Sequence, residues 1–245
     1  MNFREIKDRF FSIRKCIGCG KILEYEERDE IFCESCALAW SVAKTESCKE
    51  CSQSVVECTC QPKELAKNGS LCLRKLIFYH KKRGTPPQLR IVYRLKHRPH
   101  KRAEEFLAVE LSRVMKEELL VLEVRDVENE VVVVSVPRSI RSHRRYGIDH
   151  SERIAKALCD KMGVQYVKAI KRVALFSGEQ KRLTKQGRFK SIQKQFALVY
   201  GNALDGKYVF LFDDVVTTGA SMTACAELLR KAGAKAVICL CIAQN

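Results

Sequence analysis

The sequence lacks any apolar run long enough to cross a membrane, and it lacks an export signal. None of its 245 residues falls in a stretch that approaches the roughly 18–20 consecutive apolar residues of a membrane-spanning helix. The segment from Met1 to Lys15 mixes charged and apolar side chains, with neither a continuous apolar region nor a cleavage site. We therefore expect a cytoplasmic protein without a membrane span.

Two cofactor-related motifs are also missing. No Cys-x-x-Cys-His occurs, which excludes covalent attachment of haem. The segment 201–207 has the glycine and lysine spacing of a P-loop, but Tyr208 stands where a Ser or Thr is required. This segment also precedes an expected strand, whereas a P-loop follows one, so we exclude a P-loop nucleotide site.

Cysteine, by contrast, is abundant, with thirteen residues, eight of them in four tight pairs. In a reducing compartment such pairs are typical of zinc binding. Four thiolates leave the ion no open position, so we expect structural and not catalytic sites. The pairs are Cys16 and Cys19, Cys33 and Cys36, Cys48 and Cys51, and Cys58 and Cys60.

The first two pairs resemble the knuckles of a zinc ribbon, and Gly18 and Gly20 favour the turn that the first knuckle needs. The last two pairs could form a second four-thiolate site, but one zinc site with spare thiols is the alternative. We expect zinc to supply the fold of a small domain over residues 1–72, whose core is small. The expected core residues are Ile22, Leu23, Ile31, Phe32, Leu38 and Trp40.

The other five cysteines are scattered among apolar residues, and we expect them to be small core side chains. They are Cys72, Cys159, Cys225, Cys239 and Cys241.

Positive charge is concentrated in the second part of the chain. Residues 1–72 carry a net charge of −1, from 11 basic and 12 acidic residues, and residues 73–245 carry +17, from 34 and 17. From Arg74 to Arg102 there are 11 Lys or Arg and no acidic residue, with Tyr79 and Tyr93 interspersed. This pattern favours a surface for nucleic acid, on which bases can stack. A basic face around a small anionic ligand, or a solvated linker, are the alternatives.

Alternating strands and helices predict a doubly wound α/β domain over residues 73–245. The expected strands cover 131–136, 164–170, 196–200, 209–212 and 235–243. The clearest helices begin near Ala103, Ser151 and Ala220, and Gly163 and Gly233 are expected to end the last two.

The segment from Val209 to Ser221 carries the chemistry. Its apolar strand leads into Asp213 and Asp214, and then into the turn Thr217-Thr218-Gly219-Ala220-Ser221, where a helix starts. Ligands of open α/β sheets bind beyond the carboxyl ends of the strands. The N–H groups and dipole of the helix start favour a phosphate, and carboxylates accept hydrogen bonds from sugar hydroxyls. We therefore expect a ribose 5-phosphate site, the alternative being a capped turn beside two solvated acids.

This segment resembles the phosphoribosyl pyrophosphate (PRPP) motif of type I phosphoribosyltransferases. The resemblance implies that Mg2+ bridges the pyrophosphate and the ribose. It also implies that Arg144 and Arg145, in the arginine-rich loop 138–150, hold the pyrophosphate, and that residues 171–194 form a hood loop. The implied PRPP-binding residues are Asp213, Asp214, Thr217, Thr218, Gly219, Ala220, Ser221, Arg144 and Arg145.

The whole chain resembles the ComF family of natural-competence proteins, its ComFC branch in particular, in which a cysteine-knuckle domain precedes a PRPP-type domain. Further matching stretches are Leu95-Lys96, Ser135-Val136-Pro137, Arg145-Tyr146-Gly147 and Gln180-x-x-Leu183 with Arg188. The family pattern has Asn-Gln where this chain has Asp149-His150, and Asn where it has Ser191. These differences bear on any reaction that needs the missing amides.

The resemblance implies a role in DNA uptake during natural transformation, with single-stranded DNA as a partner. A competence helicase or other DNA-processing proteins are further candidate partners. The resemblance does not decide whether the protein is an active phosphoribosyltransferase. The alternative is a non-catalytic nucleic-acid-binding accessory protein that keeps the transferase fold.

Overall fold

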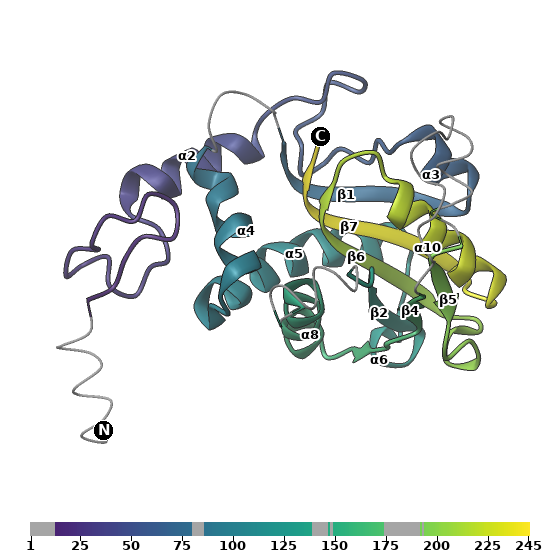
Figure 1. Ribbon diagram of the computed structural model, residues 1–245. Helices are drawn as coiled ribbons and strands as arrows, with labels where there is room; N and C mark the ends of the chain where they lie inside the picture. Colours follow the sequence, from purple (N-terminus) through teal and green to yellow (C-terminus); the bar gives the residue numbers. More distant parts are fainter. Residues whose placement is uncertain (1–12, 80–85, 139–146, 148, 174–191, 193) are drawn as a thin grey trace, which may run out of the picture.

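The computed structural model describes residues 13–79, 86–138, 147, 149–173, 192 and 194–245. Figure 1 shows a sheet domain from one end of which the first part of the cysteine-rich segment, residues 13–44, extends. Within the described residues, no helix is long and apolar enough to span a membrane.

Five parallel strands form the main sheet, in the order β1-β7-β6-β2-β3. All five residues of β2 are buried, as are seven of the nine residues of the strand 208–216 and seven of the nine of the strand 236–244. A sheet that is covered on both faces requires such burial. The strands are β1 (Ser70–Phe78), β2 (Val131–Ser135), β3 (Gln165–Tyr166), β6 (Tyr208–Val216) and β7 (Ala236–Gln244).

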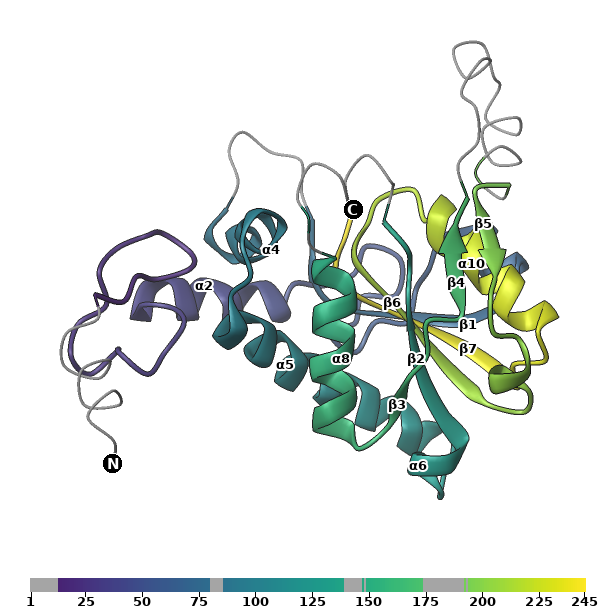
Figure 2. The ribbon, with the colours of Figure 1, turned by 60° about the horizontal axis from the view of Figure 1, so that its bottom comes forward.

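Helices cover both faces of this sheet (Figures 1 and 2). On one face lie α4 (Pro87–His97), α5 (Lys101–Val121) and α8 (His150–Met162). On the other lie α3 (Lys63–Lys67) and α10 (Ala220–Lys231). The shorter helical segments are α6 (Val127–Glu130) and the 3-10 turn η2 (Asn202–Leu204).

The α/β fold class predicted from the sequence is confirmed, and most expected elements are present. The expected strand over 164–170 is the exception, because it is divided between two sheets. Its start forms β3, whereas its end belongs to β4 (Ile170–Arg172), which pairs antiparallel with β5 (Phe196–Leu198). The five scattered cysteines are buried, as expected.

Strand β1 was not expected from the sequence, and the predicted domain boundary after residue 72 falls inside it. Its polar residues Arg74 and Lys75 interrupt the apolar run, yet both are buried. Arg74 binds Glu118 and Glu117 on α5, and Lys75 donates to the carbonyl of Cys60 at 2.6 Å. Buried charges are tolerated when they are paired in this way.

The cysteine-rich segment shares its core with the sheet domain. Phe32 and Trp40, the latter on α2 (Glu34–Lys44), pack edge-on against Phe106 of α5. Trp40 Nε1 also donates to Glu110 of α5 at 3.1 Å. Two expected core residues are placed wrongly by the sequence, since Ile22 is 55% and Leu38 65% exposed. The core therefore lies toward the sheet domain, because a segment this small cannot enclose apolar side chains by itself.

The two ion pairs of Arg74 provide a matched test of burial. Both carboxylates lie 2.7 Å from the guanidinium, but the side chain of Glu118 is 6% exposed and that of Glu117 is 59% exposed. We expect Glu118→Gln to lower the free energy of unfolding by about 3 kcal/mol, because it leaves a buried charge less compensated. Glu117→Gln should cost less than about 1 kcal/mol. Equal effects in denaturant titrations would contradict this assignment.

Candidate functional site

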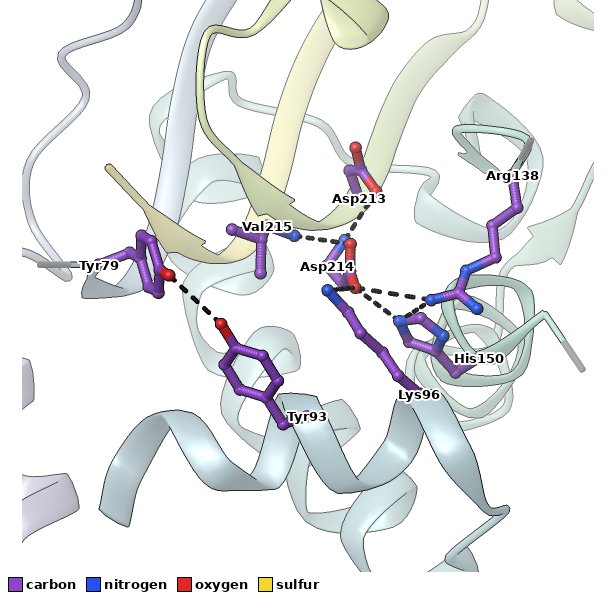
Figure 3. Close-up of polar contacts among 8 residues, drawn as sticks. All are labelled: Tyr79, Tyr93, Lys96, Arg138, His150, Asp213, Asp214 and Val215. Atoms are coloured by element: carbon purple, nitrogen blue, oxygen red, sulfur yellow. Dashed lines mark hydrogen bonds and ion pairs between the residues drawn. The ribbon is translucent and has the colours of Figure 1, made fainter. Parts of the chain in front are cut away.

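The candidate site lies at the carboxyl end of β6, where two acidic residues occupy consecutive strand positions. Successive side chains of a strand point to opposite faces, so Asp213 and Asp214 diverge, as Figure 3 shows. Asp213 lines a hollow of about 60 Å3 together with Val215, Val216 and the turn Thr217–Ser221. Asp214 faces α4 and α8 instead.

The turn over 217–221 is shaped by Gly219. This residue has φ +74°, a left-handed conformation that L side chains rarely adopt, and it precedes the first residue of α10. A Cβ atom at this position would lie 3.1 Å from Cγ of Pro62. The first N–H groups of α10 have no carbonyl partner within the helix. The turn can therefore bring backbone donors close to an anion, and Thr217, Thr218 and Ser221 line the same hollow.

Asp214 is surrounded by groups that carry or donate protons. Its Oδ2 atom lies 2.6 Å from His150 Nε2, 3.3 Å from Lys96 Nζ and 3.9 Å from Arg138 Nη2. These partners come from α8, from α4 and from the segment that follows β2 (Figure 3). Burial alone would raise the pKa of Asp214, but the hydrogen bond to His150 and the charge of Lys96 outweigh it and hold the pKa below its ordinary value.

Asp213 shows the opposite behaviour. Burial raises its pKa well above the ordinary value, and the neighbouring charge of Asp214 adds to the effect. The backbone N–H of Asp214 donates to Asp213 Oδ1 at 2.9 Å, which compensates only in part. The pair thus consists of one carboxyl group with a lowered pKa and one with a raised pKa. Two acids that share a site often differ in this way.

His150 is the residue that sequence reasoning undervalued. It is 1% exposed at the start of α8, and its Nε2 lies within hydrogen-bond distance of both Arg138 (2.9 Å) and Asp214 (2.6 Å). An ionised carboxylate only accepts, so the Nε2–H group of His150 donates to Asp214, and the same nitrogen then has no lone pair left to accept from Arg138. The only signal in the sequence was the departure from the family pattern at this position.

The cysteine pairs assemble into two clusters, one for each predicted set. Within each cluster, the four sulfur atoms all lie within 4.8 Å of one another. Cys19 Sγ and Cys33 Sγ are 3.7 Å apart, close to the roughly 3.8 Å expected between thiolates around a tetrahedral zinc ion. Backbone N–H groups of Lys21 and Glu50 lie 3.4 Å from Cys19 Sγ and Cys48 Sγ. Both clusters could therefore hold a metal ion, including the second, which the sequence left open.

Several residues of the basic block from Arg74 to Arg102 bind other groups of the protein, which its composition did not reveal. Arg94 and Arg90 donate to the carbonyls of Cys16 and Gly18, at 3.0 and 3.5 Å, and Arg102 donates to that of Glu30 at 3.0 Å. With the contacts of Arg74, Lys75 and Lys96, six described members of the block face the protein itself. The predicted pyrophosphate residues Arg144 and Arg145 lie outside the described residues, as does most of the predicted hood loop.

Comparison with known proteins identifies the class. The family profile "Phosphoribosyl transferase domain" matches residues 106–245, more than half of the chain. The chain therefore belongs to the phosphoribosyl transferase domain family. With its paired cysteine clusters and its relatives, it is a ComF-type member of that family.

The relatives are bacterial proteins named "DNA utilization protein YhgH". The protein of Salmonella typhimurium is 31% identical over 166 residues, which cover 64% of this chain and 68% of that protein. The protein of Escherichia coli K12 is 31% identical over 111 residues, covering 44% of this chain and 48% of its own length.

Two solved structures are similar to part of the chain. A hypoxanthine phosphoribosyltransferase from Staphylococcus aureus is 11% identical with a TM-score of 0.36, and the match covers 58% of this chain and 63% of that one. A phosphoribosylpyrophosphate synthetase from Mycobacterium smegmatis is 21% identical with a TM-score of 0.33, covering 53% of this chain. The match covers 32% of the length of the synthetase.

The two acids should respond oppositely to neutralisation. Because the pKa of Asp213 is raised on folding, its charge opposes folding at neutral pH, and Asp213→Asn should stabilise the protein by on the order of 1 kcal/mol. Because the pKa of Asp214 is lowered, its charge favours folding, and Asp214→Asn should cost about 3 kcal/mol. Thermal unfolding at pH 7 measures both effects.

The pH dependence provides the control. The unfolded carboxyl group titrates near pH 3.9. The gain from Asp213→Asn should be complete above the raised folded pKa and vanish below about pH 4, where both states bind the proton. The loss from Asp214→Asn should be complete above about pH 4 and shrink as the pH falls further. The exposed Asp160 on α8 offers a neutral comparison, Asp160→Asn, and effects of equal sign at the two site positions would contradict the assignment.

Proposed function

We propose that this protein binds PRPP and acts, as a phosphoribosyltransferase-like protein, in the uptake and use of DNA by bacteria. The observation that carries the proposal is the hollow beneath the turn 217–221, which joins a helix start to the side chain of Asp213. A phosphate favours the helix start and a sugar hydroxyl favours the carboxylate, so the two together suit a ribose 5-phosphate.

The roles of the site residues follow from this placement. The turn Thr217–Ser221 would hold the 5′-phosphate, and Asp213 and Asp214 would accept hydrogen bonds from the ribose hydroxyls. Lys96 and Arg138, which lie beside Asp214, add positive charge where a pyrophosphate would approach. Arg144 and Arg145 remain proposed pyrophosphate residues. Mg2+ would bind with the ligand, whose oxygen donors suit this ion, and would offset the negative charge of the pyrophosphate.

If the protein transfers the ribosyl group, the reaction is a displacement at the anomeric carbon. The acceptor forms a bond to that carbon while the bond to the pyrophosphate oxygen breaks, and pyrophosphate leaves with the electron pair. Negative charge then grows on the leaving group, which neighbouring cations would stabilise. Lys96 and Arg138 are the described residues placed for this role.

We further propose that both cysteine clusters bind zinc. Eight thiols in two compact clusters fit the ion by ligand type and spacing, and four thiolates around each ion predict a structural role. Since the cysteine-rich segment contributes few apolar side chains of its own, zinc would supply much of its folding free energy. Such thiol sites suit a reducing compartment, which agrees with a cytoplasmic location.

The DNA-related part of the proposal is supported by the relatives' names and by the charge of the chain. The formal net charge is +16, which favours association with nucleic acid. We propose single-stranded DNA as the partner, with a competence helicase or other DNA-processing proteins acting beside it. The second candidate function, a non-catalytic accessory protein for nucleic acid, is favoured by the lost Asn-Gln pair at Asp149 and His150.

Titration calorimetry with PRPP and Mg2+ tests the central proposal. The variant Asp213→Asn should lose one charge-assisted hydrogen bond to the ribose, which is worth about 1.5–3 kcal/mol. We therefore expect this variant to bind PRPP roughly 10- to 150-fold more weakly than the wild type. Because this variant should be more stable than the wild type, unfolding will not explain the loss. A wild-type protein that binds single-stranded DNA but gives no heat with PRPP would favour the accessory role.

A glycine pair gives the control for the turn. Gly219 and Gly206 both have positive φ, +74° and +66°, but an added Cβ meets Pro62 only at Gly219 and nothing within 4 Å at Gly206. Both alanine variants should lose about 1–2 kcal/mol of stability. Only Gly219→Ala should also weaken PRPP binding, by at least about tenfold. Equal affinities would contradict the placement of the phosphate.

Metal analysis of the purified protein tests the clusters. We expect two zinc ions per chain in the wild type, one for each cluster. Cys19→Ser and Cys51→Ser, each in a different cluster, should leave about one ion, because a serine replaces one thiolate of the four. Cys159→Ser, a buried cysteine outside the clusters, should keep both ions. A folded, metal-free wild-type protein would refute this part.

A further inference from the structure

Lys75, on the edge strand β1, is a buried cation whose countercharge is not a carboxylate. It is 1% exposed, and its Nζ atom donates to the carbonyl oxygens of Cys60 at 2.6 Å and Leu73 at 3.4 Å. The preceding Arg74 forms ion pairs with two carboxylates, whereas the ion pairs among the described residues include none of Lys75. Carbonyl groups satisfy the hydrogen bonds of an ammonium group but do not balance its charge. Because a buried charge is costly without an opposite charge nearby, we expect an anion beside Lys75.

The second cysteine cluster can supply this anion. Two of its members, Cys48 and Cys60, line the same cavity of about 500 Å3 as Lys75. The charge of Lys75 also acts on a third member, Cys58, since burial raises the pKa of this thiol and the lysine opposes that rise. A zinc ion held by four thiolates carries a net negative charge, because the thiolates outweigh one divalent cation. The metal-bound cluster therefore has the sign of charge that Lys75 requires.

The segment that carries the last cysteine pair is attached to β1 at several further points. The N–H group of Leu73 donates to the carbonyl oxygen of Thr59 at 3.4 Å, and Arg74 Nη2 donates to that of Val56 at 3.0 Å. Gln61 Nε2 donates to two carbonyl oxygens of β1, at 3.1 and 3.2 Å. The position of Lys75 relative to the cluster is therefore fixed by the strand.

The first cluster has a similar contact in a different environment. Arg94 of α4 donates to the carbonyl oxygen of Cys16 at 3.0 Å, but Arg94 is exposed. Water screens the charge of an exposed side chain, whereas a buried charge acts on its neighbours through a medium of lower dielectric constant. A strong electrostatic effect is therefore expected at the second cluster and a weak one at the first.

We propose that Lys75 is the countercharge of a zinc ion in the second cysteine cluster and positions this cluster on β1. The inference rests on the proposed zinc sites. Without Lys75 the anionic cluster loses its compensation, and without the ion Lys75 loses its own. Groups outside the ligand set commonly change metal affinity by roughly 10- to 100-fold. Lys75 is thus a positioning residue for the metal, in addition to the eight cysteines.

Competition with a chromogenic zinc chelator tests the proposal on the full chain. Lys75→Met removes the charge and keeps an unbranched side chain. We expect this variant to bind one of its two zinc ions roughly 10- to 100-fold more weakly than the wild type does. Lys63→Met, at an exposed lysine shortly after Cys60, is the matched control and should bind both ions as the wild type does.

Two cysteine variants identify the ion concerned. In Cys19→Ser the remaining ion would lie in the second cluster, so adding Lys75→Met should weaken zinc binding by the same factor. In Cys51→Ser the remaining ion would lie in the first cluster, so adding Lys75→Met should leave zinc binding unchanged. Equal effects in both backgrounds would contradict the assignment to the second cluster.

Thermal unfolding with and without zinc separates a charge effect from a packing effect. With zinc bound, Lys75→Met should lower the melting temperature, because the cluster loses its countercharge. After removal of zinc, the same substitution should leave the melting temperature unchanged or raise it, because it removes an uncompensated buried charge. If Lys75→Met lowers the stability of both forms equally, Lys75 has a packing role only and the proposal is wrong.

Metal analysis of the wild type separates failure of this inference from failure of the proposed function. Two ions in the wild type, with unchanged zinc affinity in Lys75→Met, would overturn only the role of Lys75. A wild-type protein without zinc in the second cluster would overturn that proposed site and this inference with it.

Discussion

The carboxylate of Asp214 connects three segments that are distant in the sequence. It contacts Lys96 of α4, His150 of α8 and Arg138 after β2, and it is 8% exposed itself. An anion in this position compensates cations that would otherwise repel one another at short range. The shape of the candidate site therefore depends on this charge, and a phosphorylated ligand would compete for the same cations. Such an arrangement is typical of sites at which stability and ligand binding make opposing demands.

Helix α4 connects the first cysteine cluster to the site. Arg90 and Arg94 donate to carbonyl groups within the first cysteine knuckle, and Lys96, on the same helix, reaches Asp214. A metal ion in the first cluster, as proposed above, would thus affect the site through the position of α4. The two parts of the chain also share one hydrophobic core.

Much of the fold was predictable because it follows from local patterns. The valine run of β2, the apolar strand before Asp213 and the amphipathic α5 are all dictated by periodicity or by continuous apolar residues. Strand β1 was not predictable in this way, because Arg74 and Lys75 read as surface residues until their partners on α5 and at Cys60 are known. The same holds for the site. The acids and the turn were evident from spacing, whereas the contacts of His150 arise between residues 64 positions apart.

Strand β1 has one neighbour in the main sheet, β7, and the two are separated by most of the chain. Ser70 pairs with Val237 and Phe78 with Gln244. During synthesis, the edge of the sheet that β1 forms must wait until the last strand has left the ribosome. Contacts of such high sequence separation slow folding and leave partly folded chains exposed. The cysteine pairs of each cluster are close in sequence and have no such delay, so a metal ion bound there, as proposed above, would be captured before the sheet closes in the nascent chain.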